Sequence, residues 1–90
     1  MSDAKVSGIV HLIEETKTYG KNNFRKRLVV LEQEQSSFTN YVPLDFIKDG
    51  CTMLDSFAVG QNVCVAINIR GNEYNGKYYV SLQGWKIDNI

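Results

Sequence analysis

The stretch from Val63 to Tyr79, VCVAINIRGNEYNGKYY, decides the fold. Its first eight residues alternate between large apolar side chains and smaller or polar ones, a period of two that is typical of a strand with one buried face. The dipeptide Asn75-Gly76 is the strongest short signal for a β-hairpin. The stretch therefore predicts a strand over 63–70, a hairpin turn over 71–76 and a last strand over Lys77–Ile87, bent near Gly84.

Three further strands are expected before this hairpin. They cover Lys5–Glu14, Phe24–Gln33 and Phe38–Phe46, all rich in β-branched or aromatic residues. Gly8, inside the first strand, suggests a bend, a bulge or a close approach of another backbone. Pro43 has no N–H group, so we expect it at an edge or a bulge of the third strand.

The segments between these strands complete the order of elements. Thr16–Asn23 is polar and contains glycine, so it is predicted to be a loop. Apolar residues between Ile47 and Phe57 have helical spacing and predict one short helix over Cys51–Phe57. The resulting order, β-β-β-α-β-β, is that of the all-β, five-stranded OB-fold barrel. An open five-stranded sheet packed on one helix is the alternative.

Length and composition favour one cytoplasmic domain. The chain has 90 residues, which predicts a single domain over 1–90. No stretch approaches the length of a membrane span, and the first residues do not resemble a signal peptide. The two cysteines, Cys51 and Cys64, are too few for a disulfide scaffold and fit a reducing cytosol. Such a small core favours oligomerisation, as a dimer or tetramer.

The charges are balanced overall and segregated locally. Ten Lys and Arg residues match ten Asp and Glu residues. The segment Thr16–Leu31 nevertheless holds five basic residues and no acidic one, whereas Glu32–Asp55 holds five acidic residues and Lys48. Because local fields decide where an anion binds, the basic segment is a candidate for phosphate contacts.

The C-terminal half resembles a known family. Leu54–Val63, the hairpin Glu73–Tyr79 and Gly84–Ile87 carry its pattern most clearly, and Gly8 also agrees with it. The family consists of short bacterial and phage proteins of unknown function, similar in fold to single-stranded-DNA-binding OB proteins. The resemblance covers nearly the whole chain and implies an OB fold and single-stranded nucleic-acid binding. The family usually has Trp where this chain has Phe24, a departure that is expected to weaken stacking.

Binding of single strands without sequence preference requires cations for the phosphates and exposed aromatic rings for the bases. Both residue types occur where an OB fold binds its ligand, on the second and third strands and in the loops that join strands one to two and four to five. The candidate nucleic-acid-binding residues are Lys17, Tyr19, Lys21, Phe24, Arg25, Lys26, Arg27, Tyr41, Arg70, Tyr74 and Lys77.

The alternation leaves the orientation of the second strand open. If Val29 and Leu31 point inward, Phe24 faces outward beside Lys26; if Leu28 and Val30 point inward, Phe24 joins the core and Arg25 faces outward. A bulge would blur this choice.

The expected positions of three further tyrosines and of the tryptophan are clearer. Tyr74 at the hairpin tip is expected to contact ligand. Of Tyr78 and Tyr79 one is expected in the core and one at the surface, because neighbours on a strand face opposite ways. Trp85 is expected in the core or at an interface, because Gly84 suggests tight packing beside it.

No catalytic or metal-binding constellation emerges, and neither a cofactor nor enzymatic activity is expected. His11 has no partner at ligand spacing and is expected to be structural, and both cysteines are expected to be small buried residues. The leading hypothesis is a single-stranded-DNA-binding protein of replication, recombination or repair, in a cell or a phage. RNA binding is the close alternative. A protein-interaction or oligomerisation module without nucleic-acid binding is the second class.

Overall fold

The computed structural model describes residues 4–90, with all of their side chains except that of Gln35. Strands dominate this part of the chain, and a 3₁₀ helix separates the fourth strand from the fifth. The elements are β1 (Lys5–Ile13), β2 (Lys17–Tyr19), β3 (Phe24–Gln35), β4 (Phe38–Ile47), η1 (Lys48–Ser56), β5 (Asn62–Tyr74) and β6 (Lys77–Asn89).

Five of these strands close into a barrel. The sheet order is β1-β5-β6-β4-β3, and β1 also pairs with β3, which closes the ring. Only β4 and β6 are parallel neighbours, and they meet at the single pair Asp45 and Gln83. The predicted OB-fold barrel is confirmed, and the open sheet is wrong because each of the five barrel strands pairs with a neighbour along both of its edges. The short strand β2 pairs with β3 outside the barrel, in the segment that was expected to be a loop.

The core lies inside the barrel and decides the orientation of β3. Val29 and Leu31 are fully buried together with Leu44 and Phe46 of β4. Val29 and Leu31 are therefore the inward pair, and Phe24 faces outward beside Lys26. Because β3 and β4 pair in one continuous register, inward and outward side chains alternate in step along both strands.

Two glycines are required by close packing. A Cβ atom on Gly8 would lie 2.8 Å from the carbonyl oxygen of Glu32, so the close backbone approach expected there is confirmed. A Cβ atom on Gly84 would lie 2.6 Å from two ring carbons of Phe46 and 3.0 Å from Val65. Phe46 fills the barrel centre only because Gly84 has no side chain.

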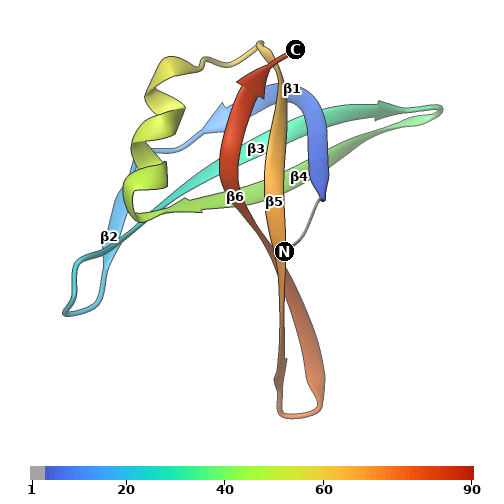
Figure 1. Ribbon diagram of the computed structural model, residues 1–90. Helices are drawn as coiled ribbons and strands as arrows, with labels where there is room; N and C mark the ends of the chain where they lie inside the picture. Colours follow the sequence, from blue (N-terminus) through green and yellow to red (C-terminus); the bar gives the residue numbers. More distant parts are fainter. Residues whose placement is uncertain (1–3) are drawn as a thin grey trace.

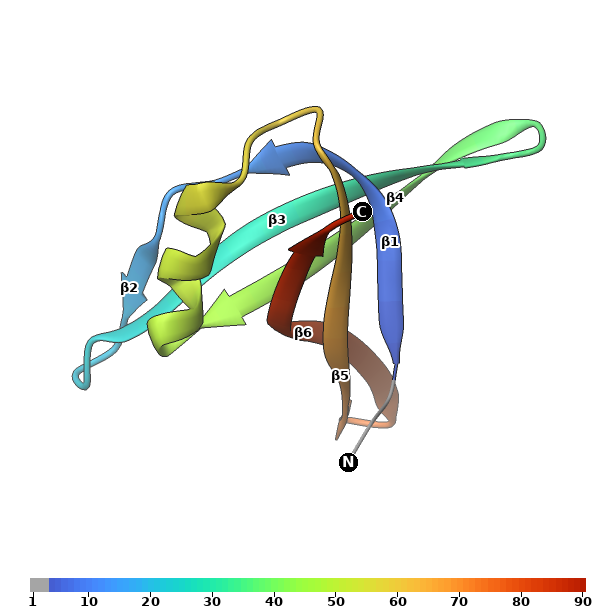
Figure 2. The same ribbon diagram turned by 45° about the horizontal axis from the view of Figure 1, so that its top comes forward.

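Hairpins extend beyond the barrel (Figures 1 and 2). The β5–β6 hairpin turns at Asn75 and Gly76, whose φ angles of 51° and 77° are those of the tight turn expected from this dipeptide. Both strands run further than predicted, β5 to Tyr74 and β6 to Asn89. The β3–β4 hairpin forms a second extension, and β2 with the start of β3 forms a third.

The helix differs from the prediction in type and position. It is a 3₁₀ helix that begins at Lys48, whereas a helix over Cys51–Phe57 was expected. Its buried side chains, Cys51 and Leu54, are three residues apart, which places them on one side of a helix with three residues per turn. Met53, one of the apolar residues whose helical spacing predicted the helix, is exposed. Within residues 4–90, no helix is long and apolar enough to cross a membrane.

Two predictions about aromatic residues need correction. Trp85 has 44% of its surface exposed, so its expected place in the core is wrong, whereas its expected place at an interface stays a prediction. It occupies an irregularity of β6, where the pairing with β5 skips one residue between Gly84 and Lys86. Tyr78 and Tyr79 are exposed by 80% and 54%, so neither is in the core. Both lie on the part of the hairpin that extends beyond the barrel, where neither face is covered.

Cys51 is buried as expected, whereas Cys64 is only half-buried.

Candidate nucleic-acid interface

A groove forms where the outer face of β3 and β4 meets the β5–β6 hairpin. We call it the central groove. It has a volume of about 220 Å³, and β4 and β6 pair beneath it at Asp45 and Gln83. Its lining residues are Phe24, Lys26, Asp45, Ile47, Arg70, Asn72, Ser81 and Gln83. A second hollow of about 240 Å³ shares Asp45 and Ser81 and extends the groove past Pro43.

One face of the β2–β3 extension carries two cations and two rings. Lys17 lies opposite Lys26, and Tyr19 lies opposite Phe24, in the antiparallel pairing of β2 with β3. Residues directly opposite in such a pair project to the same side. Phe24 is 37% exposed and Tyr19 is more exposed. This face therefore combines the two residue types that single-strand binding needs.

The two lysines of this face have weak partners. Like charges directly opposite one another destabilise a sheet. The nearest carboxylates only partly offset this repulsion: Lys17 Nζ lies 3.5 Å from Glu14 Oε1, and Lys26 Nζ lies 3.6 Å from Asp45 Oδ2. A bound phosphate between Lys17 and Lys26 would relieve the repulsion.

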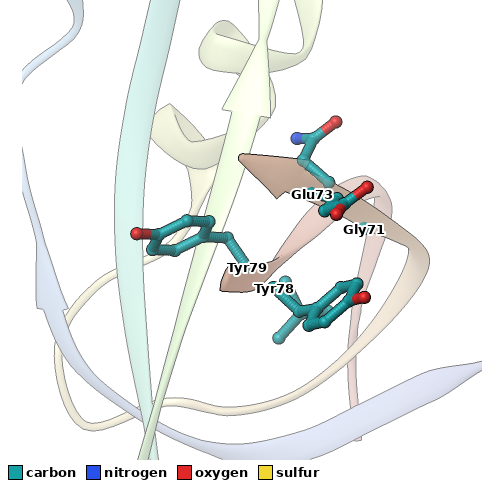
Figure 3. Close-up of a pocket in the computed structure, with 6 residues that line it drawn as sticks. Gly71, Glu73, Tyr78 and Tyr79 are labelled. Carbon is teal, nitrogen blue, oxygen red and sulfur yellow. The ribbon is translucent and has the colours of Figure 1, made fainter. Parts of the chain in front are cut away.

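The β5–β6 hairpin presents one side to the groove. Arg70 and Asn72 line the groove, and alternation places Tyr74 on the same side. Tyr79 lies opposite Asn72 and therefore shares this side, whereas Tyr78 lies on the other. Figure 3 shows the two rings leaving the hairpin in different directions, around a hollow of about 590 Å³. Tyr79 was not among the candidate nucleic-acid-binding residues from the sequence, because the sequence left open which of Tyr78 and Tyr79 lies at the surface and the face of each depends on the strand register.

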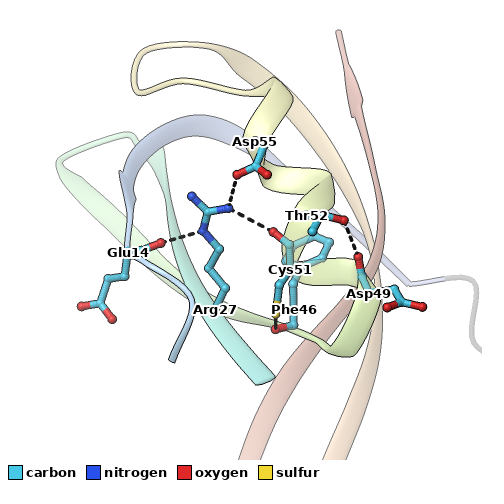
Figure 4. A network of polar contacts seen from close by, with 7 residues as sticks. All are labelled: Glu14, Arg27, Phe46, Asp49, Cys51, Thr52 and Asp55. Atoms are coloured by element: carbon cyan, nitrogen blue, oxygen red, sulfur yellow. Dashed lines mark hydrogen bonds and ion pairs between the residues drawn. The ribbon is translucent and has the colours of Figure 1, made fainter. Parts of the chain in front are cut away.

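Arg27 is turned away from this face and ties η1 to the barrel (Figure 4). Its Nε donates to the carbonyl oxygen of Glu14 at 2.7 Å. Its Nη1 donates to the carbonyl oxygen of Cys51 at 3.0 Å and to Asp55 Oδ1 at 2.7 Å. Only 16% of its side chain is exposed. These contacts satisfy carbonyl groups of the helix and of the β1–β2 link, which is a structural role.

Arg25 points to the same side of β3 as Arg27 and pairs with the other end of the helix. Its Nη2 lies 2.8 Å from Asp49 Oδ1, a carboxylate that is fully exposed. Such an exposed pair contributes little to stability and exchanges readily for another anion. Alternation thus divides the cations of β2 and β3: Lys26 lines the groove with Lys17 beside it on the same face, and Arg25 and Arg27 face the helix.

The remaining sequence candidates lie at the margins. Lys21 is exposed between β2 and β3, and Lys77 is exposed beside Tyr74; neither has an ion pair within residues 4–90. Tyr41 lies on the outer face of β4, two residues before Pro43. Its ring centroid is 4.9 Å from that of His11, whose Nδ1 is 3.2 Å from Glu32 Oε1.

His11 therefore has a carboxylate and an aromatic partner at a bulge of β1. In the described part of the chain, no three His, Cys, Asp or Glu side chains are placed to hold a metal ion.

Solved structures with a similar fold include proteins whose names refer to single-stranded DNA. Rim1, the mitochondrial single-stranded DNA binding protein of S. cerevisiae, has a TM-score of 0.69 and 19% identity, over 99% of this chain and 97% of that one. The small single-stranded DNA-binding protein of Streptomyces coelicolor has a TM-score of 0.54 and 14% identity, over 100% and 96%.

The dimeric N-terminal domain of PriB from Thermoanaerobacter tencongensis has a TM-score of 0.63 and 16% identity, over 97% and 93%. At these identities the likeness shows the fold alone. No curated protein matches the chain. One family model matches residues 5–88, nearly the whole chain, which confirms the resemblance seen in the sequence. The chain belongs to the family described as a domain of unknown function, DUF3127.

Proposed function

We propose that this protein binds single-stranded DNA, largely without sequence preference, as a one-domain module. The observation that carries the proposal is the shared outward face of Lys17, Tyr19, Phe24 and Lys26 beside a groove whose far side holds Arg70. Cations and exposed rings on one surface are the two components of single-strand binding. The fold, shared with proteins named for binding single-stranded DNA, supports the same conclusion.

In the proposed mechanism, electrostatic capture precedes stacking. Lys26 and Arg70 contact phosphates from the two sides of the central groove, while Lys17 and Lys21 extend the contact along the β2–β3 extension. Lys77 continues it at the hairpin tip. Arg25 joins when a phosphate replaces Asp49. Bases then stack on the exposed rings, each worth roughly 1–3 kcal/mol. The rings proposed for stacking are Tyr19, Phe24, Tyr41, Tyr74 and Tyr79.

We place this activity in the cytoplasm, in replication, recombination or repair of cellular or phage DNA, and propose a binding protein with no catalytic step. We also propose a homo-oligomer, a dimer or tetramer. The far side of the β5–β6 hairpin supports this, because Ile69, Tyr78 and Val80 project there together and are all exposed. Contiguous exposed apolar side chains mark protein contact surfaces.

A titration of fluorescently labelled oligo-dT tests the proposed function. Anisotropy should show tighter binding of oligo-dT than of a matched duplex, because only unpaired bases can stack on the rings. About four simultaneous phosphate contacts, drawn from these six cations, predict a slope near −3 for the logarithm of the association constant against that of salt concentration. Tighter binding of oligo-U would reassign the ligand to RNA.

Absence of binding to either single strand at micromolar protein would reject nucleic-acid binding. An oligomer that dissociates in salt, measured by light scattering, would then favour the interaction module.

The neighbouring tyrosines of β6 provide a matched pair of variants. Tyr79→Ala should weaken oligo-dT binding about five- to 100-fold, because Tyr79 lies on the groove side of the hairpin. Tyr78→Ala, compared at the same oligomeric state as checked by light scattering, should leave affinity within about twofold, because its ring leaves the opposite side of the hairpin. Both rings are exposed, so neither change should alter the melting temperature much. Equal losses in both variants would contradict the assignment of faces.

A further inference from the structure

We propose that Arg25 and Lys48 hold a phosphate of the bound strand in a second hollow, on the helix side of Phe24. In the free protein the carboxylate of Asp49 takes the place of that phosphate. The inference rests on the proposed binding of single-stranded DNA and extends it, because it assigns a phosphate site and a contact residue, Lys48, outside the central groove.

The second hollow lies between the turn that joins β2 to β3 and the start of η1. We call it the helix-side hollow. It has a volume of about 550 Å³ and is lined by Asn22, Asn23, Phe24, Arg25, Lys48 and Asp49. Phe24 also lines the central groove, so the two hollows meet at this residue. A strand whose base stacks on Phe24 can therefore place a neighbouring nucleotide in the helix-side hollow.

The pairing of β3 with β4 brings two cations to this hollow. Lys26 of β3 pairs with Ile47, the last residue of β4. Arg25 and Lys48 are the next residues beyond this pair, one on each chain segment, and both line the hollow. The two cations and the two asparagines of the turn all carry N–H donors, which suit the acceptor oxygens of a phosphate.

Lys48 has an unpaired charge and a backbone conformation that lysine seldom adopts. Within residues 4–90 its ammonium group makes no ion pair. Its φ angle of 54° lies in the left-handed region, where the other two non-glycine residues of this part of the chain are asparagines. Asparagine tolerates that region, whereas a lysine there is strained. Strained positions cluster at ligand sites, and glycine, which this φ favours, would lack the charge.

Asp49 occupies Arg25 in the free protein. Its Oδ1 accepts a hydrogen bond from Arg25 Nη2 at 2.8 Å, and its side chain is fully exposed. Such an exposed pair adds little to stability, so a phosphate can replace the carboxylate with little loss. Among the described residues, Asp49 is also the only acidic one that lines the hollow. It therefore competes with the strand for Arg25 and lowers the affinity of the site.

The test titrates labelled oligo-dT of about 12 nucleotides, a length within the range of one OB fold. Lys48→Gly should weaken binding about fivefold and flatten the salt dependence by about 0.7 units of slope, because one phosphate contact is lost. The same change should keep or raise the melting temperature, because glycine adopts the left-handed region without strain. Lys48→Arg is the matched control: it keeps the charge and should bind within about twofold of the native protein.

Asp49→Asn should tighten binding about fivefold, because it removes the competitor for Arg25. Asp55→Asn is the matched control and should change affinity less than about twofold. It removes a carboxylate of the same helix that also pairs with an arginine, Arg27, but does not line the hollow. Arg27 keeps its two backbone carbonyl acceptors in this control.

Arg25→Met tests the cause of the tightening. In that background Asp49→Asn should tighten binding less than about twofold, because no arginine is left for the carboxylate to release. An effect of general charge would persist at full size. Circular dichroism of each variant checks that the barrel has formed.

An unchanged affinity and salt slope in Lys48→Gly would overturn this inference, and so would an equal effect of Asp49→Asn with and without Arg25. Single-strand binding itself would still stand in either case. Failure of the native protein to bind oligo-dT or oligo-U would instead reject the proposed function, and this inference with it.

Discussion

Lys26→Glu combined with Arg70→Glu should weaken the binding of oligo-dT at least about 100-fold, or about 2.7 kcal/mol. The two side chains line the central groove from opposite sides, Lys26 on β3 and Arg70 on β5. Each reversal removes a phosphate contact and adds a repulsion at the same place. The two lost contacts should also flatten the dependence of affinity on salt by about 1.4 units of slope.

The measurement is a fluorescence-anisotropy titration at two salt concentrations, with far-UV circular dichroism as the check on folding. Both side chains are on the surface, so the barrel should form normally. The control carries the same change of net charge elsewhere: Lys5→Glu with Lys86→Glu, two exposed lysines on β1 and β6 outside the groove. An equal loss of affinity in this control would indicate that net charge, and not the groove, governs binding.

Gly84→Ala should lower the free energy of unfolding by about 2–3 kcal/mol. The new methyl group would overlap the ring of Phe46, which is fully buried, and would crowd Val65. The barrel has little freedom to relax, because Gly84 pairs with Ile67 between β6 and β5 at the point where Phe46 fills the interior. Chemical denaturation, monitored by circular dichroism, measures the loss.

A double-mutant cycle identifies the cause of this loss. Phe46→Leu removes the ring atoms that the methyl group meets, so the double variant should be more stable than the sum of the single losses predicts, by about 1 kcal/mol or more. Gly71→Ala is the matched glycine control, since the nearest atom to its added Cβ is 3.9 Å away. Strict additivity of Gly84→Ala and Phe46→Leu would show that the ring contact is not what makes Gly84 necessary.

Some predictions from sequence succeeded because their causes are local. The alternation from Val63 to Ile69 and the Asn75-Gly76 turn are properties of adjacent residues, and both predicted structure correctly. Gly8 was correctly expected to allow a close approach, because a glycine in a strand removes the side chain that would block one. The candidate cations and rings of β2, β3 and the hairpin were also visible as residue types.

Other features required the tertiary structure. Alternation shows that Phe24 and Arg25 face opposite ways, but only the closure of the barrel around Val29 and Leu31 decides which one faces the groove. The segment Thr16–Leu31 holds five basic residues and no acidic one, which suggested one uniform basic surface. Folding brings Asp49 and Asp55 to Arg25 and Arg27 across 24 and 28 residues, and so turns two of the three β3 cations toward the helix.

The sequence by itself thus determined the five barrel strands, their order around one short helix and the kinds of residue available for binding, because period, turn chemistry and composition act over a few residues. The tertiary structure alone decided which of them share a surface. It placed Asp45 and Gln83 side by side in the groove and Tyr79 on its border, and it left Trp85 at the surface. The physical reason is that register and closure are set by pairings between strands far apart in the chain, and one step of register moves every side chain to the other face.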